Sequence, residues 1–219
     1  MADTREPIRV LGVLAGADMP ASQLKRWIDS AEVILAADSG ADQLHAVHVI
    51  PRATVGDMDS ISETSARAQT RLIQVDDQDS TDCDKLLAFA LEEGYEAITL
   101  AGVEGDLLDH VVGTLQSAAK SPLSVRLALR RGIGVLVQGP CRKQFVTRAQ
   151  SRFSVIPLER CEGVSLSGTR WPLSLSTLEP FGLTSLSNIS EGTTVELTIE
   201  CGRAFVFLET DGSPSWGEP

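Results

Sequence analysis

The hydrophobic pattern of the first 130 residues is the feature that most restricts the fold. Short apolar runs alternate there with amphipathic stretches, the runs at residues 8–16, 31–38 and 97–102 and the stretches at residues 21–31, 82–93 and 109–120. Short apolar runs are typical of strands buried on both faces, and amphipathic stretches with a period of about 3.6 residues are typical of surface helices. This order predicts an α/β domain with a parallel, Rossmann-like sheet and helices on both faces.

The pattern changes after about residue 130. Segments of alternating apolar and polar residues follow, separated by Gly, Pro, Ser and Asn, and examples are RFSVIPLE (152–159), TTVELTIE (193–200) and RAFVFLE (203–209). A period of two residues indicates strands with one buried face, and many such strands favour an all-β sandwich or barrel. We therefore expect two domains, residues 1–132 and residues 133–219.

Charge and cysteine usage restrict the partners and the compartment. The formal net charge of -11 argues against a nucleic-acid or anionic-membrane partner, because such partners repel a negative surface. The N-terminus has no secretory pattern and no apolar run is long enough for a membrane span, so a cytoplasmic protein is expected. The four cysteines form no CxxC pair, which favours free thiols over a zinc site.

Acidic residues follow four of the predicted strands, near the point where each strand ends. The four segments are Asp38-Ser39-Gly40-Ala41 after the strand VILAA, Gly56-Asp57-Met58-Asp59-Ser60 after PRATV, residues 76–82 after LIQV, and Asp109-His110 after AITLAG and a glycine-bearing loop. Because the carboxyl ends of parallel strands meet at one edge of a sheet, we expect these acids to lie together. Mutually repelling carboxylates are best explained by a bound cation, and Mg²⁺ prefers such oxygen ligands. Asp57 and Asp59 could reach one cation if the backbone turned at Gly56.

Each acid also has a plainer explanation. Asp38 could serve a turn, and Asp79 or Thr81 could cap the helix that starts at residue 82, because Asp, Ser and Thr are common in turns and N-caps. Lys85, one turn into that helix, could contact a phosphate or pair with an acid on the same helix. For the group as a whole, acids at four strand ends favour a metal-dependent site.

The order of these motifs resembles that of the thiamine pyrophosphokinase family, over roughly residues 8–208. The matching segments, in chain order, are Asp38-Ser39-Gly40-Ala41, Pro51 with residues 56–60, residues 77–82 with Lys85, Gly102 through Asp109-His110, residues 153–158, Gly168-Thr169-Arg170-Trp171-Pro172-Leu173 and Ser185-Leu186-Ser187-Asn188.

The resemblance implies an ATP-dependent transferase that moves a diphosphate from ATP to the hydroxyl of thiamine and releases AMP. It implies an N-terminal α/β domain for nucleotide and metal, and a C-terminal β-sandwich for thiamine binding and dimerisation. It also implies a homodimer whose active sites lie at the subunit interface.

Site residues are implied by the same motif matching. Asp57, Asp59 and Asp82 would hold Mg²⁺ and act in catalysis together with Asp109, which would lie near the reacting hydroxyl. Residues for the nucleotide phosphates would be Asp38, Asp79, Thr81 and Lys85. Trp171 would stack on the thiamine pyrimidine, and Ser187 and Asn188 would form hydrogen bonds with that ring.

Four positions differ from the family pattern. Where the family usually reads Gly-Gly-Arg-x-Asp-His, Asp106 replaces a glycine and Leu107 replaces an arginine that would meet phosphate. Thr114 stands for an asparagine and Ser39 for a glycine. The chain could be a working enzyme with another basic residue, a paralogue with a shifted substrate, or a non-catalytic sensor of thiamine or nucleotide. A metal-dependent phosphohydrolase is a further alternative, in which Trp171 would have no role.

Overall fold

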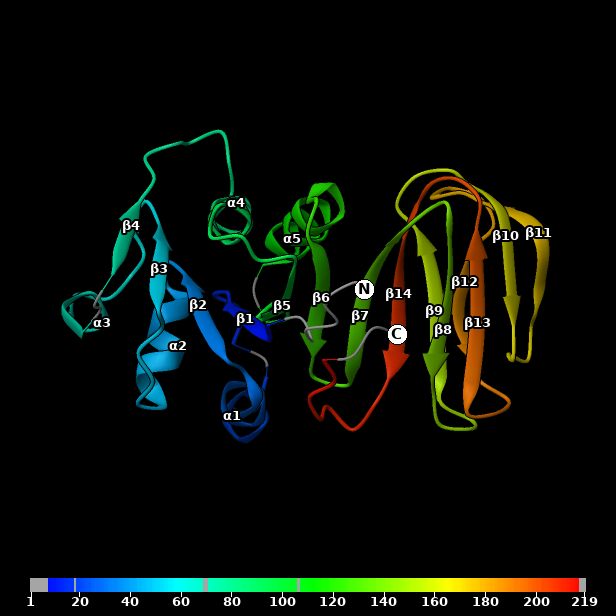
Figure 1. Ribbon diagram of the computed structural model, residues 1–219, viewed down its shortest axis with the longest axis horizontal. Helices are drawn as coiled ribbons and strands as arrows, with labels where there is room; N and C mark the ends of the chain where they lie inside the picture. The colour runs from blue at the N-terminus through cyan, green and yellow to red at the C-terminus, as the bar shows by residue number, and fades with distance from the viewer. Residues whose placement is uncertain (1–7, 18, 69–70, 106, 217–219) are drawn as a thin grey trace, which may run out of the picture. The chain divides into compact units, whose positions relative to one another are not determined.

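The structure is a computed structural model that describes residues 8–17, 19–68, 71–105 and 107–216. The chain divides between Arg130 and Arg131 into two compact units, called unit 1 and unit 2 below (Figure 1). Unit 1 is an α/β domain with a parallel sheet and unit 2 is an antiparallel β domain, which confirms the predicted fold class. None of the helices in the described part of the chain has the length and apolar character that a membrane crossing requires.

Unit 1 alternates strands and helices in the order that the hydrophobic pattern predicted. Its described elements are β1 (Val10–Val13), α1 (Ala21–Ser30), β2 (Val33–Ala37), α2 (Gly40–Ala46), β3 (Ala53–Gly56), α3 (Glu63–Ala68), β4 (Leu72–Gln74), α4 (Asp82–Glu92), β5 (Ala97–Ala101), α5 (Leu108–Lys120) and β6 (Ser124–Leu129). The helices α1 and α2 lie on one face of the sheet and α4 and α5 on the other (Figure 1). The predicted segments are confirmed, with strands a few residues shorter than the apolar runs.

The strand order of unit 1 places a crevice at its centre. The strands pair in parallel in the order β6-β5-β1-β2-β3-β4. The chain therefore moves outward from β1 to β4, and α4 then returns it to β5 on the other side of β1. Ligands of open parallel sheets bind at the carboxyl ends of the strands where the order reverses in this way.

Helix α4 covers the face of the sheet beside this crevice. It packs on β2 and β3 with Leu86, Leu87 and Ala90 buried, as the sequence predicted. The sequence places five apolar residues broadly on one side of this helix, namely Leu86, Leu87, Phe89, Ala90 and Leu91. Leu91 is nevertheless 47% exposed. At about 100° per residue it falls beyond the edge of the buried arc, so this part of the prediction was wrong. Gly94, with φ of 83°, ends the helix in a left-handed turn.

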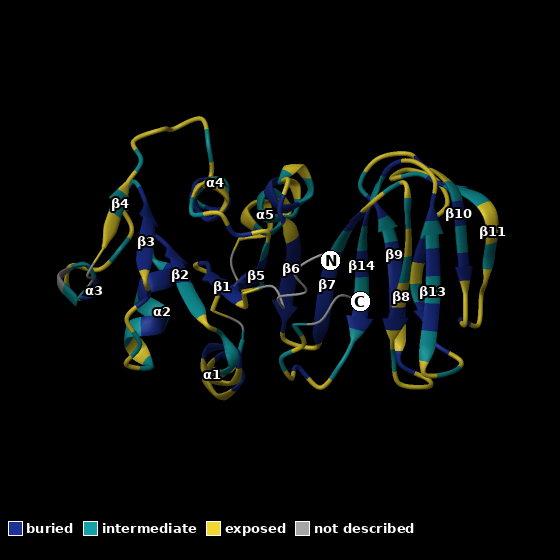
Figure 2. Ribbon diagram, in the orientation of Figure 1, coloured by how far each residue is buried: buried dark blue, intermediate teal, exposed yellow. Residues whose placement is uncertain are grey.

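Unit 2 consists of two antiparallel sheets. Its described strands are β7 (Gly132–Gln138), β8 (Cys141–Val146), β9 (Arg152–Pro157), β10 (Cys161–Ser167), β11 (Leu173–Leu178), β12 (Ser185–Ile189), β13 (Thr194–Ile199) and β14 (Arg203–Glu209). One sheet has the order β12-β9-β14-β7 and the other the order β11-β10-β13-β8. Buried residues alternate along β13 and β14, as the two-residue period predicted (Figure 2).

Two phenylalanines join the sheets of unit 2 across their buried faces. Phe145 on β8 belongs to one sheet and Phe153 on β9 to the other. Their ring centroids are 5.3 Å apart at an interplanar angle of 69°, an edge-to-face contact, and neither residue is exposed. Aromatic pairs of this geometry add to the stabilisation from buried area.

Replacing Phe145 with alanine should lower the free energy of unfolding of unit 2 by about 3–5 kcal/mol, because the change leaves a cavity between the sheets. The neighbouring residue on the same strand is a matched control: Val146 is 84% exposed, and Val146→Ala should cost less than about 1 kcal/mol. Urea unfolding followed by circular dichroism measures both. Equal losses in the two variants would contradict a core joined at Phe145.

Candidate functional site

A cavity of about 490 Å³ opens at the carboxyl ends of the unit 1 strands. Leu14 and Ala15 follow β1, Ala37 ends β2, and the remaining lining comes from the loop after β3 and from the first turns of α4 and α5. Among the predicted site residues, those that line it are Asp57, Asp59, Thr81, Asp82, Lys85 and Asp109. The structure therefore brings together acids that are separated by more than 50 residues in the sequence.

The loop after β3 passes very close to the end of β2. A Cβ atom placed on Gly56 would lie 2.9 Å from the Cβ of Asp38, so only glycine fits between the two segments. The turn between Asp57 and Asp59 is made by Met58, with φ of 68°. The expectation of a turn at Gly56 was therefore wrong in its position. Gly56 is required for the close approach, and Met58 turns the chain.

Asp38 completes a group of three carboxylates. It follows β2 with φ of 38° and is 1% exposed. Its Oδ2 accepts a hydrogen bond from Ser60 Oγ at 2.9 Å, whereas its buried Oδ1 has no hydrogen-bond partner among the described residues. One oxygen from each of Asp38, Asp57 and Asp59 lies within 4.8 Å of the others. A buried, unpartnered oxygen beside two carboxylates fits a hard divalent cation.

The three carboxyl groups differ in their pKa because their surroundings differ. Burial raises the pKa of Asp38. The hydrogen bond from Lys85 lowers the pKa of Asp57 to about 2. The contact with Asp57 and its negative charge raise the pKa of Asp59. The raised values reflect burial and unrelieved negative charge, which a bound cation would offset.

Lys85 is the buried cation of the site. It is 5% exposed, and its Nζ lies 3.2 Å from Asp57 Oδ2 and 3.4 Å from Asp82 Oδ1. Burial alone would lower the pKa of Lys85, but the hydrogen bond to Asp57 and the charge of Asp82 raise it. The ion pair with Asp82 is one of the two roles that the sequence left open. Asp82 lies against Lys85, and the carboxylate within 4.8 Å of both Asp57 and Asp59 is that of Asp38.

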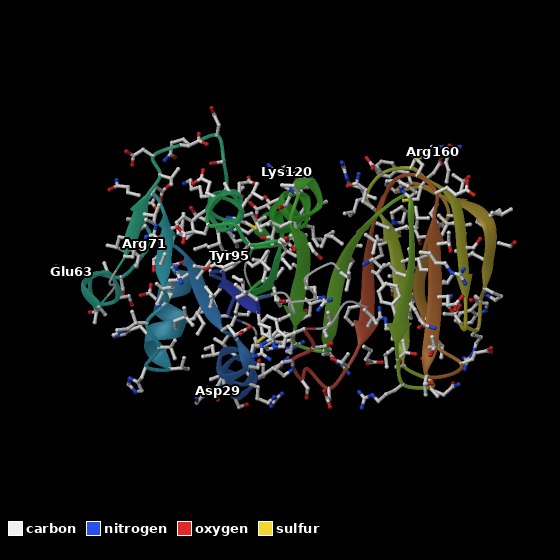
Figure 3. The ribbon with its side chains drawn as sticks, in the orientation of Figure 1. Asp29, Glu63, Arg71, Tyr95, Lys120 and Arg160 are labelled. Atoms are coloured by element: carbon white, nitrogen blue, oxygen red, sulfur yellow. The ribbon has the colours of Figure 1, made fainter. Side chains whose placement is uncertain are left out.

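Thr81 is the N-cap of α4. Its Oγ1 accepts from the Asp84 N–H at 3.1 Å, and the Asp84 carboxylate accepts from the Thr81 N–H at 3.1 Å, which forms a capping box. Asp84 also pairs at 2.9 Å with Lys120, which ties α4 to α5. Figure 3 labels Lys120 on α5. The capping explanation is thus confirmed for Thr81. Asp79 is exposed and lies outside the cavity lining, and its N–H donates to Asp77 Oδ1 at 2.9 Å.

The first turn of α5 forms the opposite rim. Asp109 is exposed there and lines the cavity beside His110 and Thr114. Leu107, the N-cap, is 64% exposed, so this turn offers an apolar side chain where the resemblance implied an arginine. Asp106 lies outside the described residues. Among the described residues of the lining, the basic ones are Lys85 and His110.

Three residues that the sequence did not single out support the site. Ser60 binds Asp38, and Gln78 donates to Asp57 Oδ2 at 3.3 Å. Gln43 donates to the carbonyl oxygens of Leu14 and Gly16, at 2.7 and 2.9 Å, which holds the loop after β1. Gln78 lies inside the acidic segment 76–82, so its position in the sequence could have identified it as a residue of the site. Gln43 has no local signal, because its partners lie nearly 30 residues away.

The remaining predicted residues lie together in unit 2. Trp171 is 56% exposed, while Asn188 is 1% exposed. The Trp171 N–H donates to Asn188 Oδ1 at 3.1 Å, and Asn188 Nδ2 donates to the Trp171 carbonyl at 2.8 Å. The Asn188 amide, expected to bind a ligand, is engaged inside the protein and holds the Trp171 backbone. Ser187 has φ of 57°, and its N–H donates to Ser154 Oγ at 2.9 Å.

Replacing Lys85 with methionine should raise the pKa of Asp57, because the hydrogen bond that holds it near 2, below its ordinary 3.8, is lost. In the unchanged protein, a depressed pKa means that the Asp57 carboxylate stabilises the folded state above about pH 4, and that this contribution disappears as the pH falls toward about 2. The variant should lose less stability over that range. Nuclear magnetic resonance titration of labelled Asp carboxyl carbons measures the pKa directly.

The matched control is Lys120→Met, which removes an exposed lysine from the Asp84 pair. It should leave the Asp57 titration unchanged. An Asp57 pKa that is the same with and without Lys85 would contradict the electrostatic account of the site.

Comparison with known proteins gives the same arrangement of two parts. Residues 24–128 match the family model "Thiamin pyrophosphokinase, catalytic domain", and residues 145–204 match "Thiamin pyrophosphokinase, vitamin B1 binding domain". The first match contains the carboxylate group and the second contains Trp171 and Asn188. The thiamine pyrophosphokinase of Bacillus subtilis (strain 168) is 27% identical over 161 residues, which cover 69% of this chain and 75% of that protein.

Solved structures share the fold. The crystal structure of thiamine pyrophosphokinase from Bacillus subtilis has a TM-score of 0.79 at 23% identity, covering 93% of this chain and all of that chain. Thiamin pyrophosphokinase from Candida albicans has a TM-score of 0.76 at 17% identity, covering 93% of this chain and 90% of that one. The two family models match in order and together span most of the sequence, so the chain belongs to the thiamine pyrophosphokinase family.

Proposed function

We propose that this chain is an ATP-dependent thiamine diphosphokinase, which transfers a diphosphate from ATP to the hydroxyl of thiamine and releases thiamine diphosphate and AMP. The names of the two matched family models support thiamine as the substrate. The observation that carries the proposal is the group of Asp38, Asp57 and Asp59 at the edge of a 490 Å³ cavity. Cavities of that size suit small-molecule ligands.

The proposed cofactor is Mg²⁺. Asp57 and Asp59 are its proposed ligands, and Asp38 suits the third position better than Asp82. The reason is that Asp38 Oδ1 has no partner among the described residues, whereas Asp82 is paired with Lys85. When bound, Mg²⁺ would neutralise part of the polyphosphate charge during transfer.

The protein's own contribution is positioning and proton transfer. Diphosphate transfer requires the hydroxyl to be in line with the leaving AMP, so most of the catalytic effect comes from orientation and electrostatics. Lys85 keeps Asp57 ionised through a direct hydrogen bond. Asp109 is the proposed acceptor of the hydroxyl proton, because it is an exposed carboxylate on the cavity rim. Thr81 acts by fixing the start of α4, and Asp79 remains a proposed phosphate-site residue.

Unit 2 supplies the proposed thiamine contacts. Thiamine carries an aromatic aminopyrimidine ring, and an exposed indole on a fixed backbone is a suitable stacking partner for it. Trp171 is the proposed stacking residue and Ser187 a proposed hydrogen-bond partner of the ring. Asn188 contributes through its two bonds to the Trp171 backbone.

We also propose that the chain forms a homodimer through the segment from β11 to β12. This segment exposes Leu175, Phe181, Leu183 and Leu186 by 52–105%, and both strands lie at sheet edges in unit 2. Apolar side chains grouped at open edges favour association. Light scattering should give the mass of two chains for the protein and of one chain for Phe181→Asp.

A cytoplasmic location is proposed too, because all four cysteines are free.

The reaction can be followed by AMP release from ATP, thiamine and Mg²⁺. The unchanged protein should produce AMP only when all three are present, and a chelator should stop it. Asp59→Asn should lower kcat at least about a hundredfold, because the variant loses a negatively charged oxygen ligand of the proposed Mg²⁺. Asp29→Asn is the control, since Asp29 is an exposed partner of Lys25 on α1, and it should leave kcat unchanged (Figure 3). Thiamine binding without AMP release would contradict the proposal.

One observation favours a second function, that of a sensor that binds thiamine or nucleotide without turnover. Leu107 is 64% exposed where the family pattern has an arginine, so a charge-assisted phosphate contact is missing. Leu107→Arg separates the two functions. In a working enzyme, the change should alter kcat/KM for ATP by about tenfold or less. In a sensor, the change should produce AMP release where the unchanged protein gives none, while both bind thiamine with the same Kd.

A further inference from the structure

The backbone that carries the exposed indole of Trp171 is held by hydrogen bonds to a buried neighbour. Asn188 binds the Trp171 backbone at both its N–H and its carbonyl, and its amide also donates to Thr169 Oγ1 at 3.3 Å and Ser185 Oγ at 3.1 Å. All of these partners lie within unit 2. A rigid base costs little further conformational entropy when a ligand stacks on the ring. The indole is therefore arranged for recognition.

Arg170 covers one face of this indole. Its guanidinium carbon lies 5.6 Å from the centre of the Trp171 ring, within the range of a cation–π contact. The position of the guanidinium is fixed by a hydrogen bond from Arg170 Nη2 to Gln150 Oε1 at 2.8 Å. A ligand that stacks on Trp171 must use the opposite face, because a fixed guanidinium occupies the first.

A cation on one face of an indole changes what the other face attracts. The guanidinium draws the π electrons toward itself, which weakens the attraction for a second cation opposite, and the two positive charges repel each other. A neutral ring experiences neither penalty and keeps its stacking and dispersion contacts. Of the two rings of thiamine, the aminopyrimidine is neutral and the thiazolium is cationic.

We infer that Arg170 is a specificity-determining residue, which acts through Trp171 to favour a neutral aminopyrimidine over a cationic thiazolium on the free face of the indole. The inference rests on the proposed function, because it takes thiamine as the ligand. Arg170 is exposed, and its side chain contacts Trp171 and Gln150 at the surface, so its replacement should leave the core of unit 2 intact.

The test compares the binding of two ring fragments to the full-length protein by calorimetry. The probes are the isolated hydroxymethyl-aminopyrimidine and an N-methylated hydroxyethyl-methylthiazolium. In the unchanged protein, the Kd of the thiazolium should exceed that of the aminopyrimidine. In Arg170→Met, which keeps a stem of similar length, the ratio of the two Kd values should fall by about threefold, the effect of one exposed cation–π contact. Arg170→Lys retains the charge and should keep most of the ratio.

Three results would overturn the inference. An unchanged Kd ratio in Arg170→Met, with thiamine still bound, overturns the role of Arg170 and leaves the proposed function standing. A ratio that falls equally in Arg170→Lys shows that shape, and not charge, determines the preference. Absence of thiamine and fragment binding to the unchanged protein overturns the inference together with the proposed function.

Discussion

Repulsion among carboxylates at the carboxyl edge of the unit 1 sheet is the constraint on which the site depends. Asp38, Asp57 and Asp59 lie within 4.8 Å of one another through one oxygen each, and Asp82 is close by. The protein offsets part of this charge with Lys85, which is buried between Asp57 and Asp82. Asp38 keeps an oxygen with no partner among the described residues, so the fold itself supplies no full compensation there. A cation is the simplest completion of such a group.

The fold was predictable from the sequence because local pattern and tertiary burial agree. Strand β1 is buried at every residue and lies in a continuous apolar run, whereas β13 and β14 alternate between buried and half-buried residues and lie in alternating segments. Helix α4 carries both a capping box and a left-handed glycine at its end, two signals that are readable over a few residues. Leu91 was misplaced because residues at the border of an amphipathic arc are decided by the neighbouring elements.

The site was predictable as a group and less so by role. Acids at the ends of neighbouring parallel strands had to converge, and Asp57, Asp59, Asp82 and Asp109 do line one cavity. Which acid lacks an ion pair depends on which carboxylates contact Lys85, and the tertiary structure decides those contacts. The same limit applies to Asn188, whose amide holds the Trp171 backbone from 17 residues away. Sequence motifs identify such residues without showing whether they touch a ligand or support a residue that does.

The close approach at Gly56 also determines the spacing between Asp38 and Asp57. Asp38 follows β2 and Asp57 follows β3, and these strands are hydrogen-bonded neighbours. With no side chain at Gly56, β2 and β3 stay at the spacing of adjacent strands, about 4.8 Å, up to the point where Asp38 leaves the sheet. The gap between the two acids is thus a continuation of the backbone ladder. A related sequence that keeps the β2–β3 pairing and this glycine should therefore keep the spacing between the two acids, even where the surrounding residues differ.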